Sequence, residues 1–161
     1  MKPYKVLVVD DAEVIHMMTD LVLEGIEFSD FKIEIFKAYS AKEAKAILQE
    51  HDDIALALID VNMETSTAGL DLVEYIRNEL KYQLIRLVIR TSEVSKYPAI
   101  DVVLKYDIND FIDKSEVTKE RLFTCVRTSI KQYKQLLDLE EKYQDMYTRL
   151  FVIKRREIFR L

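Results

Sequence analysis

The sequence predicts an α/β fold in which five parallel strands form one sheet and helices cover both of its faces. Short runs of consecutive apolar residues alternate with segments whose apolar residues recur at helical spacing, and this alternation repeats five times. The strand runs are apolar throughout, as expected for strands buried on both faces. The chain contains only two glycines and two prolines, which argues against long flexible linkers.

The first two strand–helix units occupy the N-terminal part of the chain. Residues 5–9 and 33–38 form β-branched or apolar runs and are predicted strands. Between them, residues 12–25 carry apolar side chains at helical spacing and end on a glycine that is expected to stop the helix. The second helix is expected to begin after Ser40, because Glu43 three residues later completes a capping box.

The remaining three units follow the same order and lead into a long helix. Further strands are predicted at 54–59, 87–89 and 110–113, and further helices at 70–80 and 99–105. Pro98 is well placed to open the second of these helices. Thr118 is a plausible cap for the final helix, which continues toward the end of the chain.

The last part of the chain differs from the rest, so we expect a domain over 1–135 and a helical extension over 136–161. Apolar residues there recur every seven positions in two series: Leu136, Tyr143 and Leu150, and Leu139, Met146 and Ile153. Such a pattern indicates a coiled coil, and hence a homodimer whose extension leads to an output domain beyond this sequence. The alternative is one long helix that folds back onto its own domain.

Composition narrows the class of protein. The formal net charge of −5 gives no reason to expect nucleic-acid binding. No apolar run approaches the ~18 residues of a membrane-spanning helix, and the N-terminal residues lack the pattern of a signal peptide. The single cysteine, Cys125, cannot form an internal disulfide and is expected to be a small core residue. These features favour a cytoplasmic protein.

Polar residues stand at the end of four of the five predicted strands. The first strand is followed by Asp10 and Asp11, the third by Asp60, the fourth by Thr91 and the fifth by Lys114. The carboxyl ends of parallel strands meet at one edge of a sheet, where ligands bind in open α/β folds. We therefore expect these five side chains to converge on one site.

The chemistry of this predicted site suggests a metal. Three carboxylates at close range repel one another, so at least one pKa should rise unless a cation is present. Hard oxygen ligands suit Mg²⁺, which binds one or two carboxylates, keeps waters and bridges to phosphate. No cluster of histidine or cysteine offers a zinc site, because His16 and His51 are isolated and are interpreted as ordinary helix residues.

A carboxylate near a metal can attack phosphorus and form an aspartyl phosphate. Asp60 is the natural nucleophile, because its strand is expected at the centre, between the acid pair and the fourth and fifth strands. The metal would neutralise the phosphoryl oxygens from one side. The Lys114 ammonium and the Thr91 hydroxyl would do so from the other.

These residues resemble the signature of the receiver domain of bacterial two-component response regulators, over residues 5 to about 135. The resemblance implies a five-stranded parallel sheet of flavodoxin-like order. It implies a switch rather than a true enzyme: Asp60 accepts a phosphoryl group from a sensor histidine kinase or phosphotransfer protein and later loses it by self-catalysed hydrolysis. It also implies that the main-chain carbonyl of Asn62 completes the metal site and that Phe111 is the switch aromatic.

The chain departs from the family pattern at several positions. Ser115 follows the lysine where proline is usual, so a cis peptide is not expected there. Glu64 replaces a proline in the loop after Asp60, which has an extra residue before its glycine. Ser92 stands where the family prefers a smaller residue. Glu93, like Asn62, occupies a position that tunes hydrolysis in the family.

Two further functional readings follow from resemblance. A haloacid-dehalogenase-like phosphatase also uses an aspartate nucleophile with Mg²⁺, but it needs a second aspartate where this chain has Asn62. A stand-alone receiver that docks on a partner protein is the other alternative. More loosely, the stretches VNMETSTAGLDLVEYIRNEL and YDINDFIDKSEVTKERLF resemble receivers that precede HD-type cyclic-diguanylate phosphodiesterases.

Overall fold

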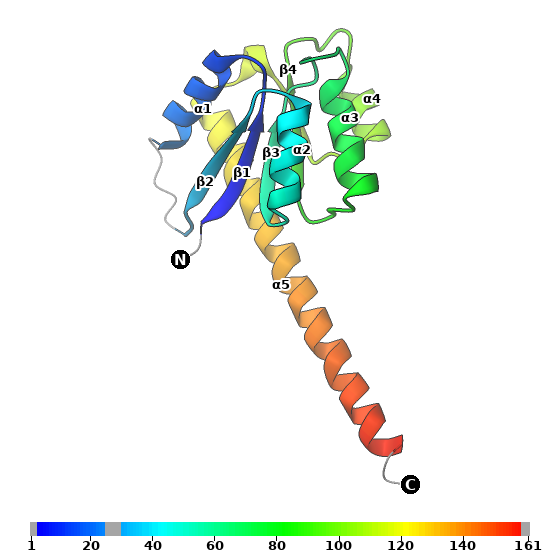
Figure 1. Ribbon diagram of the computed structural model, residues 1–161. Coiled ribbons are helices and arrows are strands. Elements are labelled where there is room, and N and C mark those ends of the chain that lie inside the picture. The colour runs from blue at the N-terminus through cyan, green and yellow to red at the C-terminus, as the bar shows by residue number, and fades with distance from the viewer. Residues whose placement is uncertain (1–2, 25–29, 159–161) are drawn as a thin grey trace.

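The computed structural model describes residues 3–24 and 30–158, with side chains up to residue 152 (Figure 1). In chain order the elements are β1 (Tyr4–Val9), α1 (Glu13–Glu24), β2 (Ile33–Ala38), α2 (Ala41–Glu50), β3 (Ile54–Ile59), α3 (Ala68–Glu74), the π-helical turn η1 (Tyr75–Glu79), β4 (Arg86–Thr91), α4 (Ala99–Lys105), β5 (Asp110–Asp113), the 3₁₀ turn η2 (Lys114–Glu116) and α5 (Lys119–Ile158).

The five strands form one parallel sheet in the order β2-β1-β3-β4-β5. Helices α1 and α5 cover one face, and α2, α3 and α4 cover the other (Figure 1). The predicted fold class, the number of strands and the flavodoxin-like order are therefore confirmed. Because β3 is the central strand of this order and β1 lies beside it, the acids that follow them lie near the middle of one sheet edge.

The core explains why the strands are apolar throughout. All six residues of β3, the run IALALI, are buried, and so are the last four residues of β1. Burial on both faces removes apolar surface from water, and each Å² removed stabilises the fold by about 25 cal/mol. This gain is the main driving force for the layered arrangement. Cys125 of α5 is buried among apolar side chains, as predicted, and burial raises the pKa of its thiol to about 11.

The capping predictions are confirmed. The Ser40 hydroxyl accepts the backbone N–H of Glu43 at 3.1 Å, and the Glu43 carboxylate accepts the N–H of Tyr39 at 2.8 Å. Thr118 caps α5, because its hydroxyl accepts the N–H of Arg121 at 3.1 Å. The predicted end of the first helix at residue 25 lies outside the described residues.

The helix predicted over 70–80 differs from the structure. It begins two residues earlier and passes into η1, where the N–H of Leu80 bonds to the carbonyl of Tyr75, five residues back. Arg77 of η1 is buried, and its guanidinium donates to the carbonyls of Ile85 and Asp107 at 3.0 Å. The wider π turn directs this arginine toward the loops that precede β4 and β5, a long-range contact that helical periodicity does not encode.

Two smaller predictions also need correction. The fourth strand begins at Arg86, one residue before the predicted run 87–89, because Arg86 pairs with Leu56 of β3. It ends at Thr91, as the sequence predicts, and its last two residues pair with β5. His51 does not lie within a helix: it is the residue that ends α2, and its N–H bonds to the carbonyl of Ile47.

Helix α5 begins in the core and ends far from it. Leu122, Val126 and Ile130 are buried against the sheet, whereas the helix then extends straight away from the domain (Figure 1). Four apolar side chains of the predicted seam are more than half exposed in this extension: Leu139, Tyr143, Met146 and Leu150. The alternative in which the helix folds back is therefore wrong. Among the described residues, no helix is both long and apolar enough to span a bilayer.

Candidate functional site

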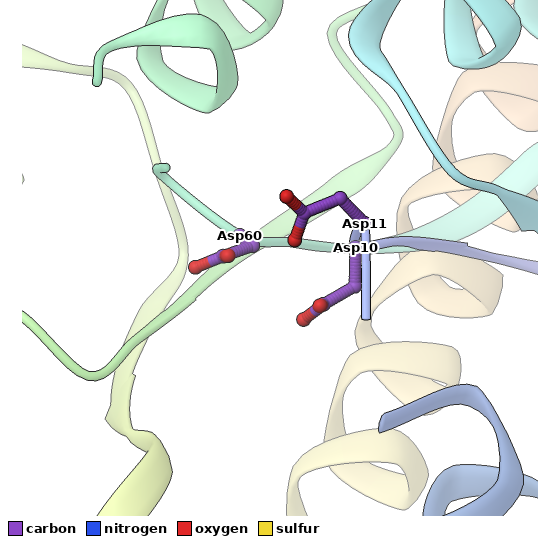
Figure 2. Close-up of side chains that lie close together, drawn as sticks. All are labelled: Asp10, Asp11 and Asp60. Carbon is purple, nitrogen blue, oxygen red and sulfur yellow. The ribbon is translucent and has the colours of Figure 1, made fainter. Parts of the chain in front are cut away.

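The three predicted acids meet at the carboxyl edge of the sheet. Each of Asp10, Asp11 and Asp60 offers a carboxylate oxygen, and these oxygens lie within 4.8 Å of one another. Figure 2 shows the three side chains projecting from the ends of β1 and β3 toward the same side. Asp10 and Asp60 are buried, whereas Asp11 is exposed to solvent. The sequence prediction of a shared site is correct for these residues.

The sheet itself fixes the two buried acids. The N–H of Asp10 donates to the carbonyl of Ala38 at 3.1 Å, and the N–H of Asp60 donates to the carbonyl of Val9 at 2.8 Å. The side chain of Asp10 is held as well, because its Oδ1 accepts the N–H of Ala12 at 3.1 Å. The acids thus sit on rigid strand ends rather than on mobile loops.

Lys114, the first residue of η2 directly after β5, completes the centre of the site. Its Nζ lies 2.9 Å from Oδ2 of Asp60 and 2.8 Å from Oδ2 of Asp10. One ammonium therefore bridges the two buried carboxylates. The peptide between Lys114 and Ser115 is trans, as expected in the absence of a proline. Instead, the Asp113 side chain accepts the N–H of Ser115 and shapes the η2 turn.

Burial dominates the electrostatics of the proposed nucleophile. Loss of hydration raises the pKa of Asp60, and the nearby charge of Asp10 adds to this effect. The ammonium of Lys114 opposes it only in part. The expectation that crowding raises at least one pKa in the cluster is met at Asp60, with desolvation as the larger cause.

Gly69 allows α3 to approach the backbone of the site. A Cβ at this position would lie 1.8 Å from the main-chain oxygen of Asp60 and 2.9 Å from Cα of Val61. The N–H of Gly69 donates to the carbonyl of Val61 at 3.0 Å. The departure in this loop has its own contact: Glu64 accepts the N–H of Lys42 at 3.3 Å, at the start of α2.

Thr91 and Phe111 lie where the sequence predicts, on the two strands beyond β3. Thr91 ends β4 and is buried, and its hydroxyl accepts the N–H of Glu93 at 3.1 Å. Phe111 pairs with Ile89 in the sheet and is half-buried against the core under α2, α3 and α4. Their roles toward a phosphoryl group stay predictions.

Asn62 lies exposed on the loop after Asp60. Its side-chain amide donates to Oε1 of Glu93 at 3.1 Å, which joins the loops that follow β3 and β4. The amide group is thus engaged away from the acids. A role for Asn62 in metal binding would therefore come from its main-chain carbonyl, as the family resemblance implies.

Two buried residues beneath the site were not predicted. His16 of α1 is buried, with Nε2 2.7 Å from the main-chain carbonyl of Asp10, so that nitrogen carries the donated proton. Arg90 of β4 is buried, and one of its terminal nitrogens lies 3.7 Å from Oδ2 of Asp10. The histidine had been interpreted as an ordinary helix residue. The arginine could have been noticed, because it is a charge inside an apolar strand and such charges need a partner.

The donor set fits a hard divalent cation. All three candidate ligands are carboxylates, and the exposed Asp11 leaves one side of the cluster open to water. Zinc prefers nitrogen and sulfur, whereas Mg²⁺ and similar ions prefer oxygen and retain waters. The cluster could therefore hold a metal ion of this class.

An acid triad, a bridging lysine and a buried threonine at the ends of a five-stranded parallel sheet define a receiver domain. In agreement, the family model described as "Response regulator receiver domain" matches residues 6–127. The chain belongs to this family.

Two of its relatives differ in how much of their length this chain covers. The chain is 41% identical over 141 residues to the 3'3'-cGAMP-specific phosphodiesterase 2 of Vibrio cholerae, covering 88% of this chain but 27% of that protein. It is 31% identical over 121 residues to a chemotaxis protein CheY homologue of Campylobacter jejuni, covering 73% of this chain and 88% of that one. The chain thus spans about a quarter of the first relative and most of the second.

Solved structures show the same fold at low sequence identity. The receiver domain of a putative LuxO repressor protein from Vibrio parahaemolyticus superimposes with a TM-score of 0.69 at 22% identity, covering 86% of this chain and 97% of that one. The receiver domain of an HD domain-containing protein from Pseudomonas fluorescens gives 0.70 at 15% identity, with 86% and 94% covered.

Proposed function

We propose that this chain is a phosphorylation-dependent switch in which Asp60 accepts a phosphoryl group in the presence of Mg²⁺. The observation that carries the proposal is the position of Lys114, whose ammonium bridges Asp60 and Asp10 at 2.9 and 2.8 Å. Asp10, Asp11 and Asp60, with the main-chain carbonyl of Asn62, would hold the metal. When bound, the metal supplies positive charge to the phosphoryl oxygens.

The transfer step uses few residues. A carboxylate oxygen of Asp60 forms a bond to phosphorus while the bond from phosphorus to the donor imidazole nitrogen breaks. The electron pair stays on that nitrogen, and because the other ring nitrogen of the donor carries a proton, the donor leaves as neutral histidine. The Lys114 ammonium donates to a phosphoryl oxygen, and the Thr91 hydroxyl, at the end of the neighbouring strand β4, turns toward another. Positioning and charge, rather than further covalent chemistry, lower the barrier.

A phosphorylation assay tests this function directly. The chain is incubated with Mg²⁺ and acetyl phosphate as a small phosphodonor, and intact-protein mass spectrometry detects an added phosphoryl group. We expect modification of the wild type and none of Asp60→Asn. Addition of a chelator should also prevent it. Modification of Asp60→Asn, or none of the wild type, would contradict the proposal.

The proposed donor is a sensor histidine kinase or phosphotransfer protein, and the surface of α1 supports a docking partner beside the site. Val14, Met17, Met18 and Leu21 are each more than half exposed and share one face of this helix. The helix begins just after Asp11, so this apolar face lies next to the acids. Leu21→Asp should slow transfer from the protein donor and leave transfer from acetyl phosphate unchanged.

The output is proposed to lie beyond the C-terminal extension. The Vibrio cholerae relative is named for a phosphodiesterase acting on 3'3'-cGAMP, and this chain matches about a quarter of it. Turnover of a cyclic dinucleotide by an attached domain is therefore the favoured output. The extension supports a homodimer, because it leaves the domain (Figure 1) and its apolar seam is exposed in the single chain.

A further inference from the structure

Arg90 is buried below the acid cluster and has few partners. Its side chain lies on the face of the sheet covered by α1 and α5, and it is 2% exposed. One terminal nitrogen donates to Oγ1 of Thr19 at 3.0 Å. The other lies 3.7 Å from Oδ2 of Asp10, and among the described residues neither it nor Nε has a hydrogen-bond partner.

The position of Arg90 is fixed by α1. The Thr19 hydroxyl donates its own proton to the carbonyl of Ile15 at 2.7 Å, so only its lone pairs face the arginine. The side chain therefore spans from β4, past β3, to the helix that follows Asp10. A buried guanidinium with one hydrogen bond is costly, and Asp10 is its nearest compensating charge.

We propose that Arg90 sets the charge of the pocket, weakening Mg²⁺ binding in the resting state and favouring the phosphorylated state. This inference rests on the proposed function. Guanidinium groups remain charged in proteins, so this positive charge is permanent. Three carboxylates together with Lys114 and Arg90 leave one net negative charge in the resting site.

The effect of the Arg90 charge changes from unfavourable for Mg²⁺ binding to favourable once the phosphoryl group is present. A phosphoryl group carries about two negative charges, so a pocket holding it and Mg²⁺ is close to neutral with Arg90 and negative without it. Arg90 is not needed to orient Asp10, which Lys114 and the Ala12 N–H hold at shorter distances of 2.8 and 3.1 Å. Removing the arginine should thus change charge more than geometry.

Calorimetric titration of the full chain with Mg²⁺ alone tests the first half of this proposal. Because a positive charge beside the acids opposes the binding of a cation, roughly tenfold tighter Mg²⁺ binding is expected for the neutral Arg90→Met. The matched control Arg90→Lys keeps the charge and should bind within about twofold of wild type. Unchanged or weaker binding by Arg90→Met would overturn the proposal.

Beryllofluoride binding at saturating Mg²⁺ tests the second half. Arg90→Met should bind this phosphoryl mimic severalfold more weakly than wild type, although it binds the metal more tightly. A general loosening of the fold would weaken both, so a loss of both affinities refutes the charge role. Arg90→Gln carries the same expectations if Arg90→Met does not fold. If neither neutral variant folds while Arg90→Lys does, Arg90 is structural and the proposal fails.

The proposed function and this inference fail in different ways. A wild-type chain that binds no Mg²⁺ and accepts no phosphoryl group contradicts the proposed function. A wild-type chain that does both, with Arg90→Met equal to it in both affinities, contradicts only the role of Arg90.

Discussion

The side-chain amide of Asn62 donates a 3.1 Å hydrogen bond to Glu93. These residues lie two positions beyond Asp60 and Thr91, on the loops that follow neighbouring strands. The second carboxylate oxygen of Glu93 is 3.4 Å from Nζ of Lys96, which holds the glutamate in place. The bond therefore ties together two loops at the mouth of the site.

This bond leads to a prediction about the lifetime of the phosphorylated state. Glu93→Ala should speed loss of the phosphoryl group severalfold, because one hydrogen bond contributes about 0.5–1.5 kcal/mol and its loss opens the loops to water. The decay is followed by mass spectrometry after removal of acetyl phosphate. Glu93→Gln, which keeps an acceptor oxygen, should decay near the wild-type rate.

A double-mutant cycle separates the bond from other effects. Asn62→Ala should speed decay as Glu93→Ala does, and the double variant should add little, because the two residues act through one contact. Asn62→Ala retains the main-chain carbonyl, so its Mg²⁺ affinity should be unchanged. Fully additive effects on decay would show that the two side chains act independently.

The strands and the residues at their ends could be predicted from the sequence, whereas the contacts of the buried arginines could not. The apolar strands and the polar residues that follow them are local patterns in the sequence. Residues such as Asp60 and Lys114 could therefore be assigned to the ends of strands from one sequence. Arg90 and Arg77 could not, because their partners lie far along the chain: Thr19 for the first and Asp107 for the second. A sequence shows only that a charged residue stands in an apolar segment. The structure is needed to identify the group that compensates its charge.

The raised pKa of Asp60 leads to a stability prediction. A carboxylate whose folded pKa is raised by burial binds a proton more readily in the folded state, so its contribution to stability is present at low pH and is lost as pH rises through the folded pKa. At neutral pH, Asp60→Asn removes a buried charge and should raise Tm by a few degrees. The gain should vanish in acid, as thermal unfolding followed by circular dichroism at several pH values would show.

Mg²⁺ should act on wild type in the same direction as this substitution. A cation that binds only the folded state stabilises it by about 2.7 kcal/mol at a hundredfold excess over Kd. Asp11→Asn should lose most of this shift while keeping its Tm in the absence of metal, because Asp11 is exposed and lies outside the buried core. A metal-dependent shift that survives in Asp11→Asn would exclude this residue as a ligand.

Gly69 offers a test of the contact between α3 and the site. Gly69→Ala places a methyl group within 1.8 Å of the Asp60 oxygen, and the backbone must shift to accept it. We expect a loss of about 2–3 kcal/mol in the free energy of unfolding, measured with urea, and slower phosphorylation. Ser66→Ala, on the loop just before α3 and exposed, should change neither.

Phe111 is predicted to relay phosphorylation rather than to enable it. The Phe111 ring packs against the core under α4 rather than against the acids. The variant Phe111→Ala should therefore accept phosphoryl groups from acetyl phosphate at close to the wild-type rate. The change in amide hydrogen exchange that beryllofluoride causes in α4 and β5 should be lost. An equal loss of phosphorylation and of this response would contradict the relay role.

The exposed seam of α5 is predicted to join two chains. In one chain, Leu139 is 63% exposed and Met146 is 52% exposed. Contiguous apolar side chains left in water mark a surface that binds a partner. Two parallel helices would bury both positions against their equivalents. Multi-angle light scattering, with and without beryllofluoride and Mg²⁺, should therefore detect a dimer in at least one state. Met146→Asp should abolish it, whereas Gln144→Asp, off the seam, should not. A wild-type chain that stays monomeric in both states would contradict the coiled coil.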